Sequence, residues 1–182
     1  MNIRNEIQTT FQNMVLEEET NITVSQICRK MNISRKTFYK YYADIYDLIS
    51  YIIHENIFVS LTQLSHMNQI KVEDSITVLN SMYSHIYEQR DFYKNLYYLF
   101  YDSHIFNKCI YQENLKLNEN IFNGIYKNEL EKEYHIHLAA MSGVNLLEKW
   151  IIDDFELSSR EIAEIFYKYV ARAWVEFIEQ YK

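Results

Sequence analysis

Proline is absent from the 182 residues of this chain, and glycine occurs only twice. Proline and glycine are the residues that most often break helices and make tight turns, so their scarcity favours an all-α fold. Apolar residues also recur at the three- and four-residue spacing of amphipathic helices through most of the chain. Because 48% of the residues are hydrophobic, the chain can bury a sizeable core and is not expected to be disordered.

Several classes of protein are excluded by what the sequence lacks. Cys28 and Cys109 stand far apart, without a second cysteine or histidine at metal-site spacing, so neither a disulfide framework nor a zinc site is expected. The amino terminus is too polar for a signal peptide, and no apolar run is long enough to span a membrane. No phosphate-binding glycine loop or nucleophile motif occurs. We therefore expect a cytoplasmic protein that is not an enzyme and uses no cofactor.

The first 50 residues carry the clearest helix signals. Apolar spacing in residues 3–15 predicts a first helix. Thr23 and Gln26 form a capping box at the start of a second, short helix. Asn32 follows where the chain must turn, because asparagine tolerates a left-handed backbone, and Ser34 is a good N-cap for a third short helix. Two short helices, a tight turn and a supporting helix together predict a helix-turn-helix unit.

The third short helix has a basic and aromatic face. Residues 26–42 hold five basic and no acidic side chains, although the whole chain has a net charge of −7. Phe38 and Tyr42 fall on the core side of this helix. The opposite side mixes cations that bind phosphate with groups that reach base edges in a major groove about 12 Å wide. A solvated basic helix is the alternative, but here the charges coincide with two capped helices and a turn residue.

Longer helices follow. Asp44 is predicted to cap a fourth helix that runs to about Ser65, and the break in the pattern at 67–71 predicts a domain junction. An N-terminal three-helix domain (1–50) is thus joined by a long helix to a C-terminal helical bundle (51–182). Apolar spacing predicts bundle helices at 72–88, 90–101, 105–130, 134–152 and 158–181, the last of which starts at the capping box Ser158 to Glu161. With the helices that precede them, the chain is expected to contain about nine helices.

The run ITVSQICRKMNISRKTFYKYYADIYDLI (22–49) resembles the DNA-binding domain of TetR-family transcriptional regulators. The resemblance covers about residues 3–55 and has two departures. Asn32 stands where the family usually has a turn glycine, and Ile45 stands where it usually has a phosphate-contacting lysine. The resemblance implies that Ser34, Thr37, Tyr39 and Tyr41 contact double-stranded operator DNA. The basic outer side of the third helix adds Arg35, Lys36 and Lys40 as phosphate-binding candidates, and the capping residue Thr23 completes the candidate set.

Two further segments, HIYEQRDFYKNL (85–96) and SGVNLLEKWI (142–151), resemble the C-terminal domain of one Gram-positive branch of the same family, which includes a dihydroxyacetone-kinase regulator. The resemblance implies a repressor with a small-molecule effector and a homodimer built from the last two helices. Aromatic residues are candidates for the effector pocket, with ordinary core packing as the alternative: Tyr83, Tyr87, Tyr97, Tyr101 and Trp150. The candidate dimer interface comprises Gly143, Leu147, Phe166, Tyr169, Val170, Trp174 and Phe177.

Two functions stay open at this point. The first is a DNA-binding regulator controlled by an effector, in which the fourth helix, through Phe58 and Leu61, transmits binding to the recognition helices. The second is a DNA-binding accessory factor whose C-terminal domain docks a protein partner and binds no effector. An internal cavity favours the first function, and an exposed aromatic patch favours the second.

Overall fold

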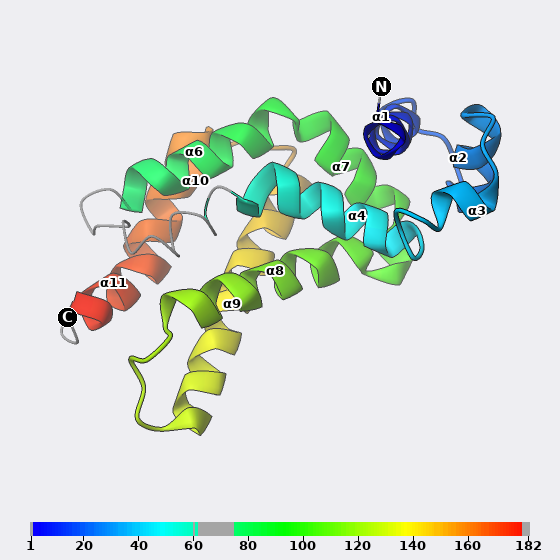
Figure 1. The fold of residues 1–182 in the computed structure, drawn as a ribbon. Helices are drawn as coiled ribbons and strands as arrows, with labels where there is room; N and C mark the ends of the chain where they lie inside the picture. The colour runs from blue at the N-terminus through cyan, green and yellow to red at the C-terminus, as the bar shows by residue number, and fades with distance from the viewer. Residues whose placement is uncertain (1, 60, 62–74, 180–182) are drawn as a thin grey trace.

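The computed structural model describes residues 2–59, 61 and 75–179, and every regular element within them is helical. The predicted all-α fold is therefore confirmed. Figure 1 shows α1, α2 and α3 grouped at one end of the molecule, the bundle of α6 to α11 at the other, and α4 between them. No helix in these described ranges is long and apolar enough to cross a membrane.

The N-terminal unit has the capping chemistry that the sequence predicts. Thr23 and Gln26 form a complete capping box, and Asn32 adopts a left-handed backbone with a φ of 53°. Asp44 accepts a hydrogen bond from the amide of Asp47 and so caps the fourth helix. Asn2 caps α1 and Ser34 caps α3. The helices of this unit are α1 (Ile3–Leu16), α2 (Val24–Lys30), α3 (Arg35–Phe38) and α4 (Ile45–Ile53).

Helix α4 does not continue as a regular α-helix. It passes at once into a π-helical turn, η1 (His54–Phe58), in which the backbone is wider than in an α-helix. Leu61 beyond this turn is buried. The predicted continuation of the helix from 62 to Ser65 and the predicted junction at 67–71 lie outside the described residues.

The C-terminal bundle differs from the prediction at one connection. A helix was expected over 105–130, but it ends at Ile121, and the next helix begins at Glu129 rather than Tyr134. The reason is local: Gly124 takes a φ of 77°, and the side chain of Asn128 caps the first turn of the next helix. The elements are α6 (Ser75–Glu88), α7 (Arg90–Leu99), η3 (Tyr101–Ser103), α8 (Ile105–Ile121), α9 (Glu129–Ile152), α10 (Ser159–Phe166), η4 (Tyr167–Ala171) and α11 (Arg172–Glu179).

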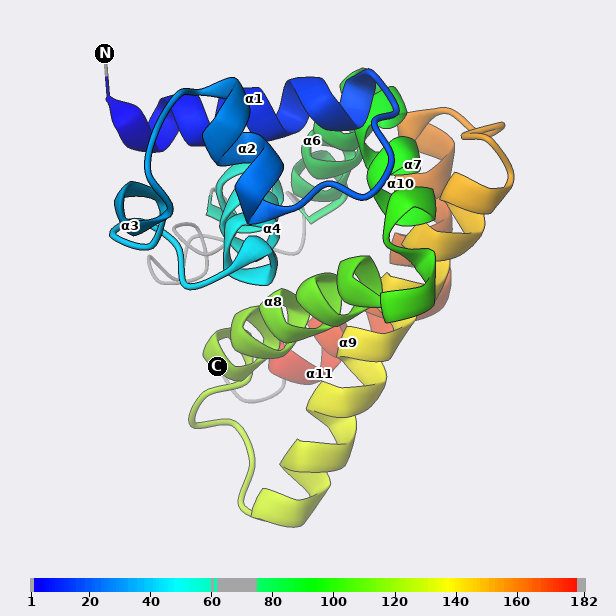
Figure 2. The same cartoon turned by 90° about the vertical axis from the view of Figure 1, so that its right-hand side faces the viewer.

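The N-terminal unit is joined to the bundle by more than the chain connection through α4. In Figure 2 the C-terminal end of α1 lies beside α7. Asn95 of α7 donates a hydrogen bond to the carbonyl of Val15 (3.2 Å), and the rings of Phe11 and Phe100 lie 6.4 Å apart. The buried apolar residues of both regions form one continuous cluster. The expectation that the fourth helix alone spans the two regions is therefore incomplete.

Candidate nucleic-acid interface and ligand cavity

Helix α3 is held in place by its cap and by two buried rings. Ser34 accepts a hydrogen bond from the amide of Thr37 (3.0 Å), and the two hydroxyl oxygens lie 2.9 Å apart. Phe38 and Tyr42 are buried, with ring centroids 5.9 Å apart. The Tyr42 hydroxyl also accepts a hydrogen bond from Gln8 of α1 (2.6 Å). The short helix therefore has a fixed inner side and a fixed orientation on α1.

The outer side of α3 presents the side chains that the sequence predicts. Arg35, Lys36 and Lys40 are exposed, and more than half of the Tyr39 side chain (53%) is accessible. Lys36 and Lys40 form no ion pair with any carboxylate of the described residues, so both ammonium groups are available to phosphate. Thr37 and Tyr41 are half-buried beside them, and Thr23 and Ser34 are exposed at the N-termini of α2 and α3.

Lys30 and Arg35 of the basic segment form contacts within the protein. Lys30 forms ion pairs with Glu17 and Glu19, and its hydrogen bond with Glu19 raises the pKa of Lys30. Arg35 donates a hydrogen bond to Ser25 of α2, which orients its guanidinium along the face of the two helices. The surface that faces outward is therefore centred on α3 and excludes Lys30. The sequence gives no sign of the Lys30 pairing, because its partners lie in the preceding loop.

The departure at Ile45 also has a structural explanation. Ile45 is half-buried and packs against the hydrophobic core at the start of α4, so it presents no cation to DNA. The neighbouring Tyr46 is instead 48% exposed in the first turn of the same helix. Sequence reasoning did not single out Tyr46, since its exposure depends on how α4 is rotated against the core.

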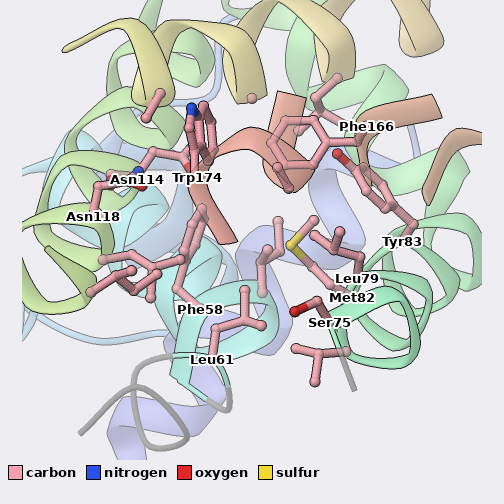
Figure 3. A pocket seen from close by; sticks show the side chains of 18 of the residues that line it. Phe58, Leu61, Ser75, Leu79, Met82, Tyr83, Asn114, Asn118, Phe166 and Trp174 are labelled. Carbon is pink, nitrogen blue, oxygen red and sulfur yellow. The ribbon is translucent and has the colours of Figure 1, made fainter. Parts of the chain in front are cut away.

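A cavity of about 220 Å³ lies inside the C-terminal bundle (Figure 3). Its wall combines the π turn after α4 with α6, α8, α9 and the last helical segment. Most of the lining is apolar, and no Asp, Glu, Lys, Arg or His of the described residues contributes to it. Lining residues include Ile57, Phe58, Leu61, Leu79, Met82, Tyr83, Ile110, Asn114, Asn118, Phe122, Gly143, Leu147, Phe166 and Trp174.

Of the five aromatic residues predicted to line an effector pocket, Tyr83 lines this cavity and the other four lie elsewhere. Trp150 is buried and donates its indole N–H to the carbonyl of Leu157 (2.9 Å), and Tyr87 stacks on it with centroids 6.0 Å apart. The Tyr97 hydroxyl donates to Glu148 (2.7 Å), and Tyr101 is about half exposed. These four residues therefore pack the core or the surface of the bundle.

The candidate dimer residues fall into two groups within the subunit. Gly143, Leu147, Phe166 and Trp174 line the cavity within the subunit. A Cβ atom at Gly143 would lie 3.0 Å from the side-chain nitrogen of Asn114, so this glycine allows α8 and α9 of one subunit to approach closely. The other three predicted residues are the half-buried Val170, Phe177, which packs on the rings of Tyr126 and His135, and Tyr169, which is 72% exposed.

A stripe on α9 that the sequence did not indicate is exposed instead. Leu130, Tyr134 and Leu138 are each more than 60% exposed, and their four-residue spacing puts them on one side of the helix. In Figures 1 and 2 this N-terminal part of α9 projects away from the rest of the bundle. A large apolar stripe on a projecting helix is typical of a contact surface.

The cavity is connected to α4 by polar contacts around the π turn. His54 Nδ1 lies 2.7 Å from the carboxylate of Glu113 on α8, and that carboxylate, which is 4% exposed, also accepts a hydrogen bond from Lys116 (2.6 Å). On the other side, Asn56 lies 3.5 Å from Gln89, between α6 and α7. The turn whose side chains reach the cavity is thus tied to α8 and to the connection between α6 and α7.

Comparison with protein families agrees with both halves of this description. A family model for the C-terminal region of TetR-type transcriptional regulators matches residues 73–172, which is more than half of the chain. A model for the helix-turn-helix domain of resolvases matches residues 16–44, the segment that contains α2, the turn and α3. No curated individual protein matches the sequence. The chain is a DNA-binding transcriptional regulator and belongs to the TetR family.

Proposed function

We propose that the protein is a homodimeric repressor that binds operator DNA through α3 and releases it when a small molecule occupies the cavity. The position of the cavity carries this proposal. Its wall includes Ile57 and Phe58 of the π turn, which directly continues α4, and α4 begins beside the recognition helix at Asp44. An internal cavity is also the feature that favours an effector over a docked protein partner.

The DNA contacts in this proposal are those of the outer side of α3. Lys36 and Lys40 would neutralise backbone phosphates, and Tyr39 and Arg35 would reach base edges or phosphates in the major groove. Ser34, Thr37, Tyr41 and Thr23 border the same surface and would donate hydrogen bonds to the backbone. The net charge of −7 outside the first 50 residues would repel DNA and so orient the encounter.

The effector signal would pass through α4 and the π turn. π-helical turns inside α-helices are rare and occur frequently at functional sites, and Phe58 of this turn lines the cavity. His54 and Asn56 hold the turn against α8 and against the α6–α7 connection in the position that the structure shows. A ligand that prefers one position changes operator affinity, and operator must change ligand affinity by the same factor.

Substituting Phe58→Leu is expected to reduce this coupling more than it reduces DNA affinity without ligand. The measurement is the Kd for operator DNA with and without 2-phenylethanol, a neutral molecule of a size that suits the cavity. In the wild type we expect the ligand to weaken operator binding by roughly 5- to 150-fold, and in Phe58→Leu by a factor closer to one.

The matched control for this variant is Phe92→Leu. Phe92 is as buried as Phe58, at 3% exposure, but it lies outside the cavity lining. It should retain the wild-type coupling factor. If 2-phenylethanol occupied the cavity but bound equally well in the presence and absence of operator, occupation of the cavity would not be coupled to DNA binding.

The proposed homodimer would use the exposed stripe of α9, together with Tyr169. A two-fold dimer suits a pseudo-palindromic operator, whose half-sites lie about one helical turn apart. Leu138→Glu would place two carboxylates in the apolar contact, so we expect the dimer to dissociate at least tenfold more readily. Sedimentation velocity at micromolar concentration measures this change.

Tyr98→Glu is the control for the dimer experiment, because Tyr98 is 51% exposed on a different helix, α7. It should leave the sedimentation coefficient unchanged. A wild-type protein that sediments as a monomer at micromolar concentration would contradict the homodimer. A dimer that survives Leu138→Glu would instead make the α9 stripe available to another protein, as in the accessory-factor alternative.

A further inference from the structure

The cavity has a chemical character that limits which molecules can occupy it. Burial of an ion in an apolar site without a partner is strongly unfavourable, and the described lining holds no charged side chain. Two carboxylates of α8 are adjacent in sequence to lining residues: that of Glu113 is bonded to His54 and Lys116, and that of Glu119 belongs to an exposed residue. The described part of the lining therefore disfavours carboxylates, phosphates and ammonium groups.

Polar atoms with unused hydrogen-bonding capacity nevertheless face the cavity. Tyr83 is 2% exposed, and its hydroxyl makes no hydrogen bond to any residue that the structure describes. Burial alone raises the pKa of this phenol well above its ordinary value, so the hydroxyl remains protonated and can donate. On α8, the side-chain amide of Asn118 donates to the carbonyl of Asn114 (2.7 Å), and the Asn114 side chain has no hydrogen-bond partner in the same described part.

These polar groups lie at separate places along the wall. Figure 3 shows Asn114 and Asn118 on one side of the cavity and Tyr83 on the other, with Phe58 and Met82 between them. A buried donor or acceptor that is left without a partner costs about 1–3 kcal/mol. A ligand with an apolar body and a neutral polar group would therefore gain both from burial of its body and from pairing with one of these groups.

Size sets a further limit. An apolar cavity of about 150 Å³ holds one benzene molecule. In proportion, the cavity volume of about 220 Å³ accommodates a ligand of about nine non-hydrogen atoms.

We infer that the effector is a small, uncharged and mainly apolar molecule whose neutral polar group pairs with the hydroxyl of Tyr83. This inference rests on the proposed effector function of the cavity and names the class of ligand. On this inference, phosphorylated metabolites and organic acids bind the cavity more weakly than neutral molecules of the same size.

Four molecules with nearly the same skeleton test the inference: 2-phenylethanol, ethylbenzene, phenylacetate and 2-phenylethylammonium. Their binding to the full-length protein at neutral pH is measured by titration calorimetry and by ligand-observed NMR. We expect 2-phenylethanol and ethylbenzene to bind, and each ion to bind at least about 100-fold more weakly than the alcohol. The Tyr83→Phe variant should bind 2-phenylethanol roughly fivefold more weakly than the wild type and should bind ethylbenzene with unchanged affinity.

Two blocking variants show whether binding occurs in the cavity. Ala139→Leu on α9 and Ala171→Leu in η4 add a side chain to the lining from different helices, and both should abolish binding of the two neutral molecules. Circular dichroism confirms that each variant is folded, and two positions keep the test valid if one variant is unstable.

The outcomes separate the inference from the proposed function. If either ion bound as tightly as the alcohol to the wild type and was blocked by Ala139→Leu, the ligand class would be wrong and the effector cavity would stand. If Tyr83→Phe left the affinity for 2-phenylethanol unchanged, Tyr83 would not be the polar partner. If no molecule distinguished the wild type from both blocking variants, the effector cavity itself would be refuted.

Discussion

The combined substitution Arg35→Ala, Lys36→Ala and Lys40→Ala is expected to weaken binding to operator DNA by at least about 10³-fold at 0.1 M salt. A cation that neutralises a phosphate releases a counterion, and each such contact contributes about 0.9 to the slope of log K against log salt. In a homodimer the variant removes up to six such cations. Neither Lys36 nor Lys40 forms an ion pair with a carboxylate in the described part of the chain, so both charges are available to phosphate. The measurement is operator Kd by fluorescence anisotropy between 50 and 300 mM salt.

Lys30→Ala is the matched control for this experiment. Lys30 belongs to the same basic segment but is paired with Glu17 and Glu19, so its loss should change the salt slope by less than one unit. Tyr39→Phe removes only a hydroxyl and should lower affinity without changing the slope. A triple variant that binds operator as tightly as Lys30→Ala would show that α3 is not the DNA-binding surface.

Phe38→Ala is expected to lower the free energy of unfolding by about 3–5 kcal/mol. The Phe38 ring is completely buried and contacts the rings of Tyr39 and Tyr42, with centroids 5.7 Å and 5.9 Å away. Its removal leaves a cavity under α3. Tyr42, whose hydroxyl is bonded to Gln8 of α1, then loses its contact with the Phe38 ring. Urea denaturation followed by circular dichroism measures the change.

The comparison for Phe38→Ala is Tyr39→Ala on the adjacent, outward-facing residue. Because Tyr39 is 53% exposed, its truncation should cost less than about 1 kcal/mol of stability while still weakening DNA binding. A loss of stability in Phe38→Ala no larger than in Tyr39→Ala would contradict the assignment of inner and outer sides of α3.

Local chemistry explains which parts of the fold can be predicted from the sequence. The caps at Thr23, Ser34, Asp44 and Ser158 depend on residues within three positions, and all four occur as predicted. Apolar periodicity runs across the boundary between α8 and α9, so it predicts one helix there, whereas Gly124 and Asn128 mark the turn that the structure contains.

The positions of the cavity and of the outer surfaces depend on information that helical periodicity does not contain. The π turn η4 (Tyr167–Ala171) shifts the register of the last helix by about one residue, or about 100° around the axis. The turn η1 shifts the register beyond His54 in the same way. Phe166 and Trp174 lie on either side of η4, and both line the cavity.

The charge and packing of single side chains also depend on tertiary structure. Lys30 and Lys36 are equivalent in the sequence, yet only Lys30 meets carboxylates from the loop after α1. Tyr83, Tyr87 and Trp150 are all aromatic and inward-facing, but only Tyr83 reaches the cavity. Sequence patterns thus identify the class of each surface but not the contacts of its members.

The central claim, that the outer side of α3 reads a specific DNA sequence, is tested most directly by selection of DNA from a randomised double-stranded library. The wild type and the variant with Arg35→Ala, Lys36→Ala and Lys40→Ala are carried through the same rounds at 0.15 M salt. We expect the wild type to enrich an inverted repeat with half-sites about one helical turn or slightly more apart, and the variant to enrich none. Enrichment of the same sequence by both proteins, or of no sequence by the wild type, would contradict the account.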